Sequence, residues 1–371
     1  MKGAVCKLIA VFILVFSFSF SFAKSENENQ ISTGTTKEEV NEVIEHHMAD
    51  DYYYTFFSDK EAGKHYGFPL PVILIDNGLK VFSSSEFDYG NQLVVKDGQT
   101  YKLYHSKIYK TDAAGNLEYK KDKSGKDTGY PINARPLDFS ITKNVLNIIL
   151  TGLLMILFFG AMAKSYSQSL VPKGIAKIFE PIVLYIKEEI AIPTIGEKHH
   201  AKFMPYLLTI FFFIWFVNML GMTPLGMNVT GNIAVTFALA ILTFIITQFN
   251  GKKTYWGHIF DPLGKSMPWV GKGPLYLLLV PIEILGIFIK PFSLMIRLFA
   301  NMSAGHIVMM SLLGMIFIFK SWMGGTLTFG LTAFIMIIEF FVALLQAYVF
   351  TILSALYFGM AVEEHHAEEA H

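Results

Sequence analysis

Cysteine is almost absent from this sequence, which contains a single residue of that type, Cys6. A lone thiol excludes an intrachain disulfide framework and a zinc site built from several thiolates. Charged residues are also scarce, at 16% of the chain, whereas soluble domains contain roughly 25%. The 30 basic and 30 acidic residues cancel, so the chain lacks the excess of positive charge that nucleic-acid binding requires.

The charged residues are distributed unevenly along the chain. Residues 24–143 carry 34 of them, whereas the longer remainder, residues 144–371, carries only 24. This second part is too apolar for a water-soluble fold, because it holds more apolar surface than a soluble core can bury. The sequence therefore predicts a polar domain followed by a mainly α-helical, polytopic membrane domain.

The N-terminal residues have the pattern of a secretory signal peptide. Two lysines precede an apolar run at residues 8–22, and the small residues Ser21 and Ala23 occupy the positions that matter for cleavage. We expect residues 1–23 to be removed, which places the start of the mature chain outside the cytoplasmic membrane. The alternative is that this segment is retained as a first membrane helix.

Residues 24–140 are expected to form a small extracytoplasmic α+β domain. Residues 38–47 have apolar positions at helical spacing, and an Asn-Gly dipeptide at Asn77, between two apolar runs, is typical of a β-hairpin. The neighbouring His46 and His47 would point to different faces of a helix, which favours a surface position over a metal site. The sequence does not indicate what this domain binds.

Uncharged stretches divide residues 141–362, the predicted membrane domain, into separate segments. Residues 144–163 are long enough for one crossing of a ~30 Å hydrocarbon core. Residues 203–251 are also uncharged and, at ~1.5 Å rise per residue, are more than twice as long as the core is thick. They must therefore cross twice, and the glycine-rich residues 221–231 mark the turn.

The loops on either side of this second stretch are basic. The loop at residues 164–202 also contains a predicted interfacial amphipathic helix, and the loop at residues 252–273 has four lysines against one aspartate. Both loops lie on the cytoplasmic side if the first span runs inward, as the signal peptide requires. The tail, residues 363–371, is then cytoplasmic as well.

Residues 274–362 differ from the earlier spans because charged residues interrupt their apolar run. A charge at membrane depth costs at least ~2.5 kcal/mol and usually faces a cavity, a partner or an ion path. Arg297 and Glu339 are such residues, whereas Glu283 has the alternative of snorkelling with Lys290 to the membrane interface. A glycine-containing break divides this segment into a long helical hairpin and brings the crossings to about five.

The polar residues of this hairpin can be matched across its two helices. If the turn centres near Trp322, positions about equally distant from it face each other, so Arg297 faces Gln346 and His306 faces Glu339, each to within about one residue. Polar residues are few here, so two polar pairs in one register are informative. Two structural alternatives stay open: an ion pair between Arg297 and Glu339, and a role for His306 as an interhelical hydrogen-bonding residue.

Residues 290–306 resemble the arginine motif of subunit a of the F-type ATP synthase, and residues 339–350 resemble its last membrane helix. The likeness extends over about residues 160–362. It implies that the proton-translocating residues are Glu283, Arg297, Asn301, His306, Glu339 and Gln346. In one respect the chain departs from the best-known bacterial pattern, since histidine here precedes glutamate in the outer half-channel pair, an exchanged order that the family also contains.

The resemblance implies a stator subunit of a bacterial ATP synthase, placed in the cytoplasmic membrane with its N-terminal domain in the periplasm. Its implied partners are the ring of c subunits, subunit b, the lipid bilayer and protons. Protons would enter near His306 and Glu339, ride on a ring carboxylate and leave past Glu283, while Arg297 separates the two half-channels. No cofactor, metal or nucleic acid is implied, and no catalytic site is expected in this chain.

A secondary transporter that binds an anion through Arg297 is the alternative of a different class. Such folds usually show internal repeats, and none is found in this sequence. A binding module on a membrane anchor would need only one span. The choice between protons and sodium ions would depend largely on the ring.

Overall fold

The structure is a computed structural model that describes residues 48–59, 64–121, 127–168, 174–223, 228–261, 269–318 and 322–363. The predicted signal peptide, the predicted helix of residues 38–47 and residues 364–371 lie outside these ranges. The chain divides into two compact units, one formed mainly by Glu45–Leu150 and the other mainly by Thr151–Thr223 and Asn228–His371.

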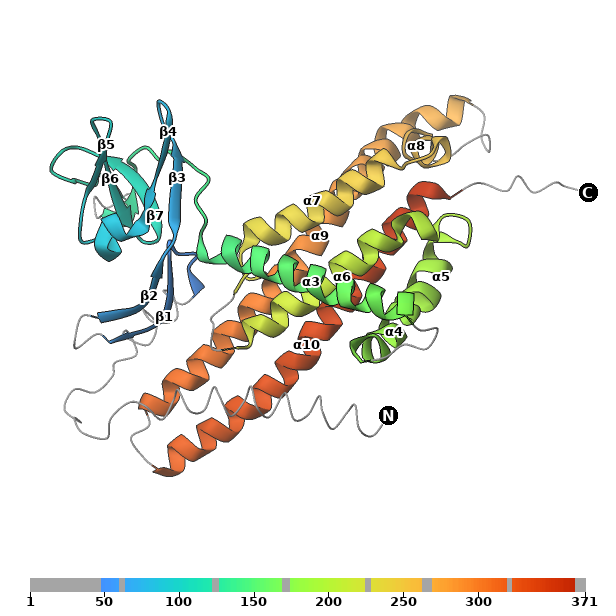
Figure 1. Ribbon diagram of the computed structural model, residues 1–371. Helices are drawn as coiled ribbons and strands as arrows, with labels where there is room; N and C mark the ends of the chain where they lie inside the picture. The colour runs from blue at the N-terminus through green and yellow to red at the C-terminus, as the bar shows by residue number, and fades with distance from the viewer. Residues whose placement is uncertain are drawn as a thin grey trace, which may run out of the picture. The chain divides into compact units, whose positions relative to one another are not determined.

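Short antiparallel strands build the first unit (Figure 1). The strands are β1 (Tyr53–Asp59), β2 (Lys64–Pro69), β3 (Pro71–Ile75), β4 (Leu79–Ser83), β5 (Val94–Lys96), β6 (Gln99–Tyr104), β7 (Lys107–Thr111), β8 (Tyr119–Lys121), β9 (Asp127–Pro131) and β10 (Leu137–Asp138). Their orders within sheets are β1-β2, β10-β3-β4, β5-β6-β7 and β8-β9, and the 3₁₀ segment η1 (Ser84–Gly90) follows β4. The β part of the expected N-terminal domain is confirmed.

Alternating apolar residues place one side of these strands in a common core. Val72 and Leu74 of β3 are fully buried, and they belong to the same cluster as Tyr101 of β6 and Ile108 of β7. Alternate residues of a strand point to opposite faces, so the other side of β3 points away from this core. The unit is therefore built from small sheets that share one interior.

The hairpin predicted from the Asn-Gly dipeptide is formed by β3 and β4. Ile75 pairs with Leu79, and the connecting residues Asn77 and Gly78 have φ angles of 49° and 133°. Asparagine and glycine accept such positive values more readily than other residues, which explains why the chain reverses here.

Asp76, at the start of this turn, connects the hairpin to the sheet that contains β6 and β7. Its Oδ1 lies 2.6 Å from Nζ of Lys110, and the hydroxyl of Tyr101 donates to its Oδ2 at 2.7 Å. These two hydrogen bonds, that from Lys110 above all, hold the pKa of the Asp76 carboxyl below its usual value. Asp76 is therefore an ionised link between two sheets.

We expect Asp76→Asn to lower the stability of this unit at neutral pH. Because the folded-state pKa lies below the unfolded value, the carboxylate contributes stability that is present above about pH 3.9 and is lost as the pH falls through the folded pKa. The difference between variant and wild type should therefore shrink in acid. Hydrogen exchange of β3 and β6 peptides in the full-length chain measures it, with the exposed Glu118 replaced by Gln as the control. A difference that persisted unchanged at about pH 2 would contradict this reading.

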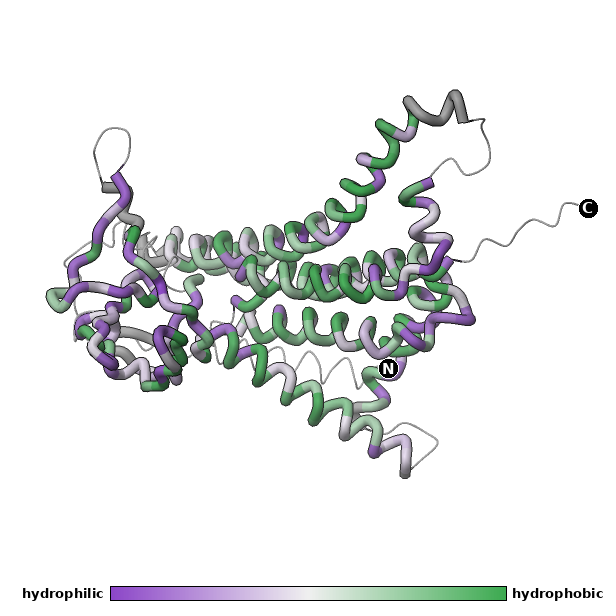
Figure 2. The backbone as a smooth tube through the Cα atoms, turned by 90° about the horizontal axis from the view of Figure 1, so that it is seen from above, coloured by the Kyte–Doolittle hydropathy of each residue, from purple (hydrophilic) through white to green (hydrophobic). Residues whose placement is uncertain are grey.

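Helices build the second unit, and the first of them starts in the β unit. They are α3 (Lys143–Gln168), α4 (Ile175–Tyr185), the π-helical η2 (Ile186–Ala191), α5 (Ile192–Ile195), α6 (His200–Gly221), α7 (Ile233–Phe249), α8 (Lys253–Phe260), α9 (Trp269–Ile318) and α10 (Trp322–Val362). Figure 2 shows that the long helices are predominantly hydrophobic, whereas hydrophilic residues are frequent along the strands.

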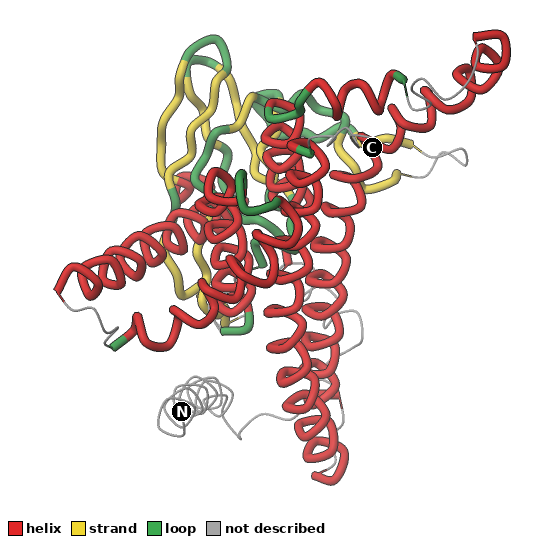
Figure 3. The backbone as a smooth tube through the Cα atoms, turned by 90° about the vertical axis from the view of Figure 1, so that its right-hand side faces the viewer, coloured by secondary structure: helices red, strands yellow, loops and turns green. Residues whose placement is uncertain are grey.

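Within the residues that the structure describes, four helices are long and apolar enough to cross a membrane: α3, α6, α9 and α10. α7 and α8 are bent by 102° at a short break, and they supply a fifth span if the pair is counted as one. The expected polytopic fold is confirmed, as are the reversal between α6 and α7 and the long C-terminal hairpin. In Figure 3 the hairpin is visible as two long helices side by side, which are α9 and α10 of Figure 1.

The C-terminal half of α10 packs tightly against the preceding helices. The ring of Phe358 stacks on that of Phe203 in α6, with centroids 4.7 Å apart. A Cβ atom on Gly359 would lie only 2.0 Å from the backbone oxygen of Thr194, so α10 approaches α5 more closely than any other residue type would permit. These contacts fix the helix that carries Glu339 and Gln346.

Candidate functional site

The candidate residues all lie on the hairpin of α9 and α10. α9 carries Glu283, Arg297, Asn301 and His306, and α10 carries Glu339 and Gln346. Of these side chains, His306 and Gln346 are buried, Glu283 and Glu339 are half-buried, and Arg297 and Asn301 are exposed.

The carboxyl group of Glu339 lies against α9 at Gly305. A Cβ atom built on Gly305 would be 2.0 Å from Oε1 of Glu339, so the absence of a side chain at this position makes room for the carboxyl group. Gly305 and Glu339 are equidistant along the chain from Trp322, which is the register expected for the hairpin. The structure thus brings Glu339 next to the residue that precedes His306.

Arg297 lies on the exposed side of α9, between the buried residues Leu294 and Leu298. Within the described part of the chain, it forms no ion pair with Glu339 and no hydrogen bond with Gln346. Gly305, against which the Glu339 carboxyl group lies, is ~12 Å from Arg297 along the helix axis. The structure therefore does not favour the alternative in which these two charges pair within the hairpin.

Glu283 lines an open pocket of about 220 Å³ at the other end of α9. The pocket is also lined by Tyr255 and His258 of α8, by Lys290, which lies about two helical turns further along α9, and by Glu363 just beyond α10. Glu283 is therefore accessible from the end of the helical unit at which α8 and the C-terminus of α10 lie.

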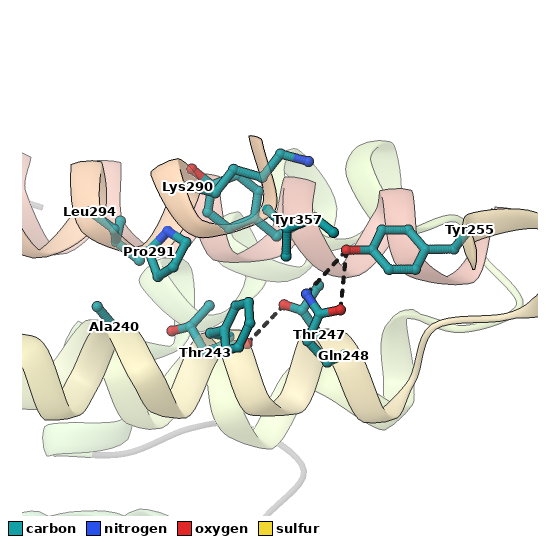
Figure 4. Close-up of a pocket in the computed structure, with 11 residues that line it drawn as sticks. Ala240, Thr243, Thr247, Gln248, Tyr255, Lys290, Pro291, Leu294 and Tyr357 are labelled. Carbon is teal, nitrogen blue, oxygen red and sulfur yellow. Dashed lines mark hydrogen bonds between the residues drawn. The ribbon is translucent and has the colours of Figure 1, made fainter. Parts of the chain in front are cut away.

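A second, adjoining cavity extends from this pocket toward the middle of the hairpin (Figure 4). Lys290 and Tyr357 form one wall, with Lys290 Nζ 5.8 Å from the centre of the tyrosine ring. Thr243, Thr247 and Gln248 of α7 form the facing wall, and Tyr255, which accepts a hydrogen bond of 3.1 Å from Gln248 Nε2, lies at one end.

Pro291 adds a further polar group to the wall of this cavity. A proline has no N–H to donate, so the carbonyl oxygen four residues earlier, that of Ile287, loses its helical partner. Both residues line the cavity. A free carbonyl in a membrane helix is tolerated where it meets water or polar side chains, which agrees with the hydroxyl and amide groups opposite.

The residues of α7 and α8 in this cavity were not among the sequence-based candidates. Thr243 and Thr247 are spaced by one helical turn, and Gln248 follows directly, within a segment that is otherwise apolar. That spacing is a signal that a polar strip faces the protein interior. As to metals, no group of three His, Cys, Asp or Glu side chains comes together within the described ranges.

Comparison with known proteins agrees with this arrangement. The family model described as ATP synthase A chain matches residues 145–359, and one described as a domain of unknown function matches residues 43–139. The boundary between the two matches lies close to the start of α3.

Curated relatives with similar sequences carry the same subunit name. ATP synthase subunit a 2 of Chlorobaculum tepidum is 45% identical over 243 residues, covering 63% of this chain and 66% of the relative. ATP synthase subunit a of Chloroherpeton thalassium is 42% identical, and that of Myxococcus xanthus 43% identical; each covers 63% of this chain, with 70% and 78% of the relatives matched. The secondary transporter is not favoured, and the chain belongs to the ATP synthase A chain family.

Proposed function

We propose that this chain is the proton-translocating stator subunit of an ATP synthase membrane sector, with two offset half-channels that face a ring of small subunits. The observation that carries the proposal is the exposed position of Arg297 within a membrane helix. A guanidinium group stays charged at any physiological pH, and a charge at this depth does not face lipid. Arg297 must therefore face a polar partner or an aqueous path.

The surroundings of Arg297 suit a closely packed partner helix. The neighbouring exposed positions on the same side of α9 are Ser293, Ala300, Asn301 and Ala304. Small residues allow the backbones of membrane helices to approach each other. A helix of the ring, which carries a carboxylate at membrane depth in this family, would then pass within reach of the guanidinium group.

Two polar regions that are separated along the axis of α9 support the proposal of two half-channels. Glu339 and His306 lie ~12–14 Å from Arg297 toward the hairpin turn, and Glu283 lies ~21 Å from it in the opposite direction. The pocket of Glu283 continues into the cavity beside Lys290, which shortens the apolar distance to Arg297. Protons would enter at the first region and leave at the second.

In this mechanism, Arg297 keeps the two regions apart. Its fixed positive charge stabilises the deprotonated carboxylate of a ring subunit that passes it, and it repels a proton that would move directly between the half-channels. A proton can then reach the exit only by rotation of the ring. The transmembrane potential supplies ~2.3 kcal/mol per charge for each 100 mV.

The basic loops support an orientation in which α8 and the C-terminus are cytoplasmic and the β unit is periplasmic. On this reading, residues 24–140 form the periplasmic domain, residues 141–362 the proton channel and residues 363–371 the tail. Subunit b is the second proposed protein partner, and the cytoplasmic membrane of a bacterium is the proposed location. ATP is made elsewhere in the complex, so this chain needs no catalytic site of its own.

Photo-crosslinking of the assembled complex tests the proposal. A benzophenone maleimide is attached to Ala300→Cys or Ala304→Cys in a Cys6→Ala background, and the adducts are identified by mass spectrometry. Both positions lie beside Arg297 and should form adducts with a small subunit that carries a membrane carboxylate. Ile156→Cys on α3, which is 71% exposed, is the control and should not. Adducts from position 156 but from neither position on α9 would refute the proposed ring contact.

A further inference from the structure

The hairpin β3–β4 in the N-terminal unit has an inverted distribution of polar and apolar residues. A sheet with one face in water normally directs its polar side chains outward. Here Lys80 is the only charged residue of the two strands, and its side chain is 4% exposed and points inward, where Nζ donates to the backbone oxygen of Lys96 at 3.0 Å. The outer face carries aliphatic side chains instead.

The outward side chains of this sheet form one continuous apolar surface. Strand pairing places Leu79 beside Ile75 and Ile75 beside Leu137, and the backbone N–H of Phe139 donates to Ile73. The exposed fractions are 44% for Ile75, 69% for Leu79, 61% for Val81, 66% for Leu137 and 63% for Phe139. We refer to these five residues as the apolar sheet face. A cluster of this kind usually marks an interaction surface.

The chain leads directly from the apolar sheet face into a membrane span. β10 ends at Asp138 and α3 starts at Lys143, so the connection reaches at most ~17 Å. The junction is fixed by hydrogen bonds, because Asp50 accepts from the backbone N–H of Asn144 at 3.0 Å and from the hydroxyl of Thr142 at 3.0 Å. The sheet is thus held beside the point at which α3 enters the membrane.

Strand spacing keeps the rest of the apolar sheet face close to β10, the strand that leads into α3. Neighbouring strands are ~4.8 Å apart, so β4 lies only ~10 Å from β10. The interfacial layer of a bilayer is ~5–7 Å deep on each side. Val145 and Ile149 in the first turns of α3 are exposed as well, so exposed apolar residues also lie at the start of the membrane span.

We propose that the apolar sheet face rests on the phospholipid bilayer, with Leu79, Val81 and Phe139 inserted at the boundary between head groups and acyl chains. Its short connection to the membrane span favours lipid over a protein partner, since it keeps the sheet within reach of the bilayer surface. An aromatic residue at the interface, such as Phe139, is typical of such anchoring. The contact would hold the β unit against the membrane.

Depth-dependent fluorescence of the full-length chain in phosphatidylcholine and phosphatidylglycerol vesicles tests this proposal. An environment-sensitive NBD probe is attached at Val81→Cys, and in a second variant at Leu79→Cys, each in a Cys6→Ala background. Lys107→Cys on β7, an exposed position of the other sheet, is the matched control. Vesicles made with acyl chains brominated near the head group are compared with unbrominated ones.

An interfacial contact ~5–10 Å deep should shift probe emission to the blue at positions 79 and 81 and lower its intensity by roughly half in brominated vesicles, with neither effect at position 107. A blue shift without quenching by bromine would mean that protein covers this face, and it would overturn the proposal. Emission typical of water at both positions, or equal quenching at position 107, would overturn it as well.

Discussion

Membrane vesicles that contain the assembled complex with Arg297→Ala should make no ATP when a proton gradient is imposed. The variant removes the fixed charge that attracts a deprotonated ring carboxylate, so the ring loses the electrostatic step that couples proton transfer to rotation. The chain should still insert into the membrane, because Arg297 forms no hydrogen bond or ion pair with any other residue that the structure describes. Synthesis and subunit content are measured in the same vesicles.

Ser293→Ala is the matched control, since this position lies on the same exposed side of α9 one turn away and carries no charge. It should support synthesis near the wild-type rate. Passive proton permeability is the second readout: without the charge at position 297, the membrane should leak protons through this chain. A normal rate of synthesis in the Arg297→Ala vesicles would contradict the role proposed for the arginine.

Much of the helical unit follows from the positions of charged and turn-forming residues. A membrane helix excludes charge except at functional positions, so the uncharged lengths alone predict α3, α6 and α7 and the reversal between the last two. The hairpin register follows from its turn near Trp322, because two straight helices from one turn must pair equidistant positions. The contact between Gly305 and Glu339 agrees with that register.

The cavity beside Lys290 could not be predicted in the same way. Its walls come from four helices, and the 102° bend between α7 and α8 that brings Tyr255 to Gln248 depends on tertiary packing. The Asn-Gly signal predicts the β3–β4 hairpin, but not how the hairpin joins other strands, since β10 is distant in sequence and only two residues long. The inward position of Lys80 likewise depends on contacts across the sheets.

Glu339→Gln should reduce ATP-driven proton pumping by roughly tenfold or more, because a glutamine cannot take up and release a proton. The substitution keeps the size and the hydrogen-bonding capacity of the side chain, so the packing of α10 against α9 should be preserved. Complex assembly should therefore change much less than proton flow. Pumping at the wild-type rate, measured with a pH-sensitive dye in vesicles of equal subunit content, would exclude an essential role for Glu339.

Gly305→Ala tests whether the placement of this carboxyl group matters as well as its chemistry. A methyl group at position 305 would lie 2.0 Å from Oε1 of Glu339, so the flexible end of the glutamate must move away from its site beside His306. Gly330→Ala makes the same change on α10, where the methyl group would meet nothing within 4 Å beyond its own stretch of helix backbone, and it controls for the effect of an added methyl group on a membrane helix. Pumping should fall in the first variant and not in the second.

In a background that already carries Glu339→Gln, Gly305→Ala should have little further effect, because the displaced group no longer carries a proton. A full additional loss in that background would show that Gly305 acts through helix packing and not through the position of Glu339.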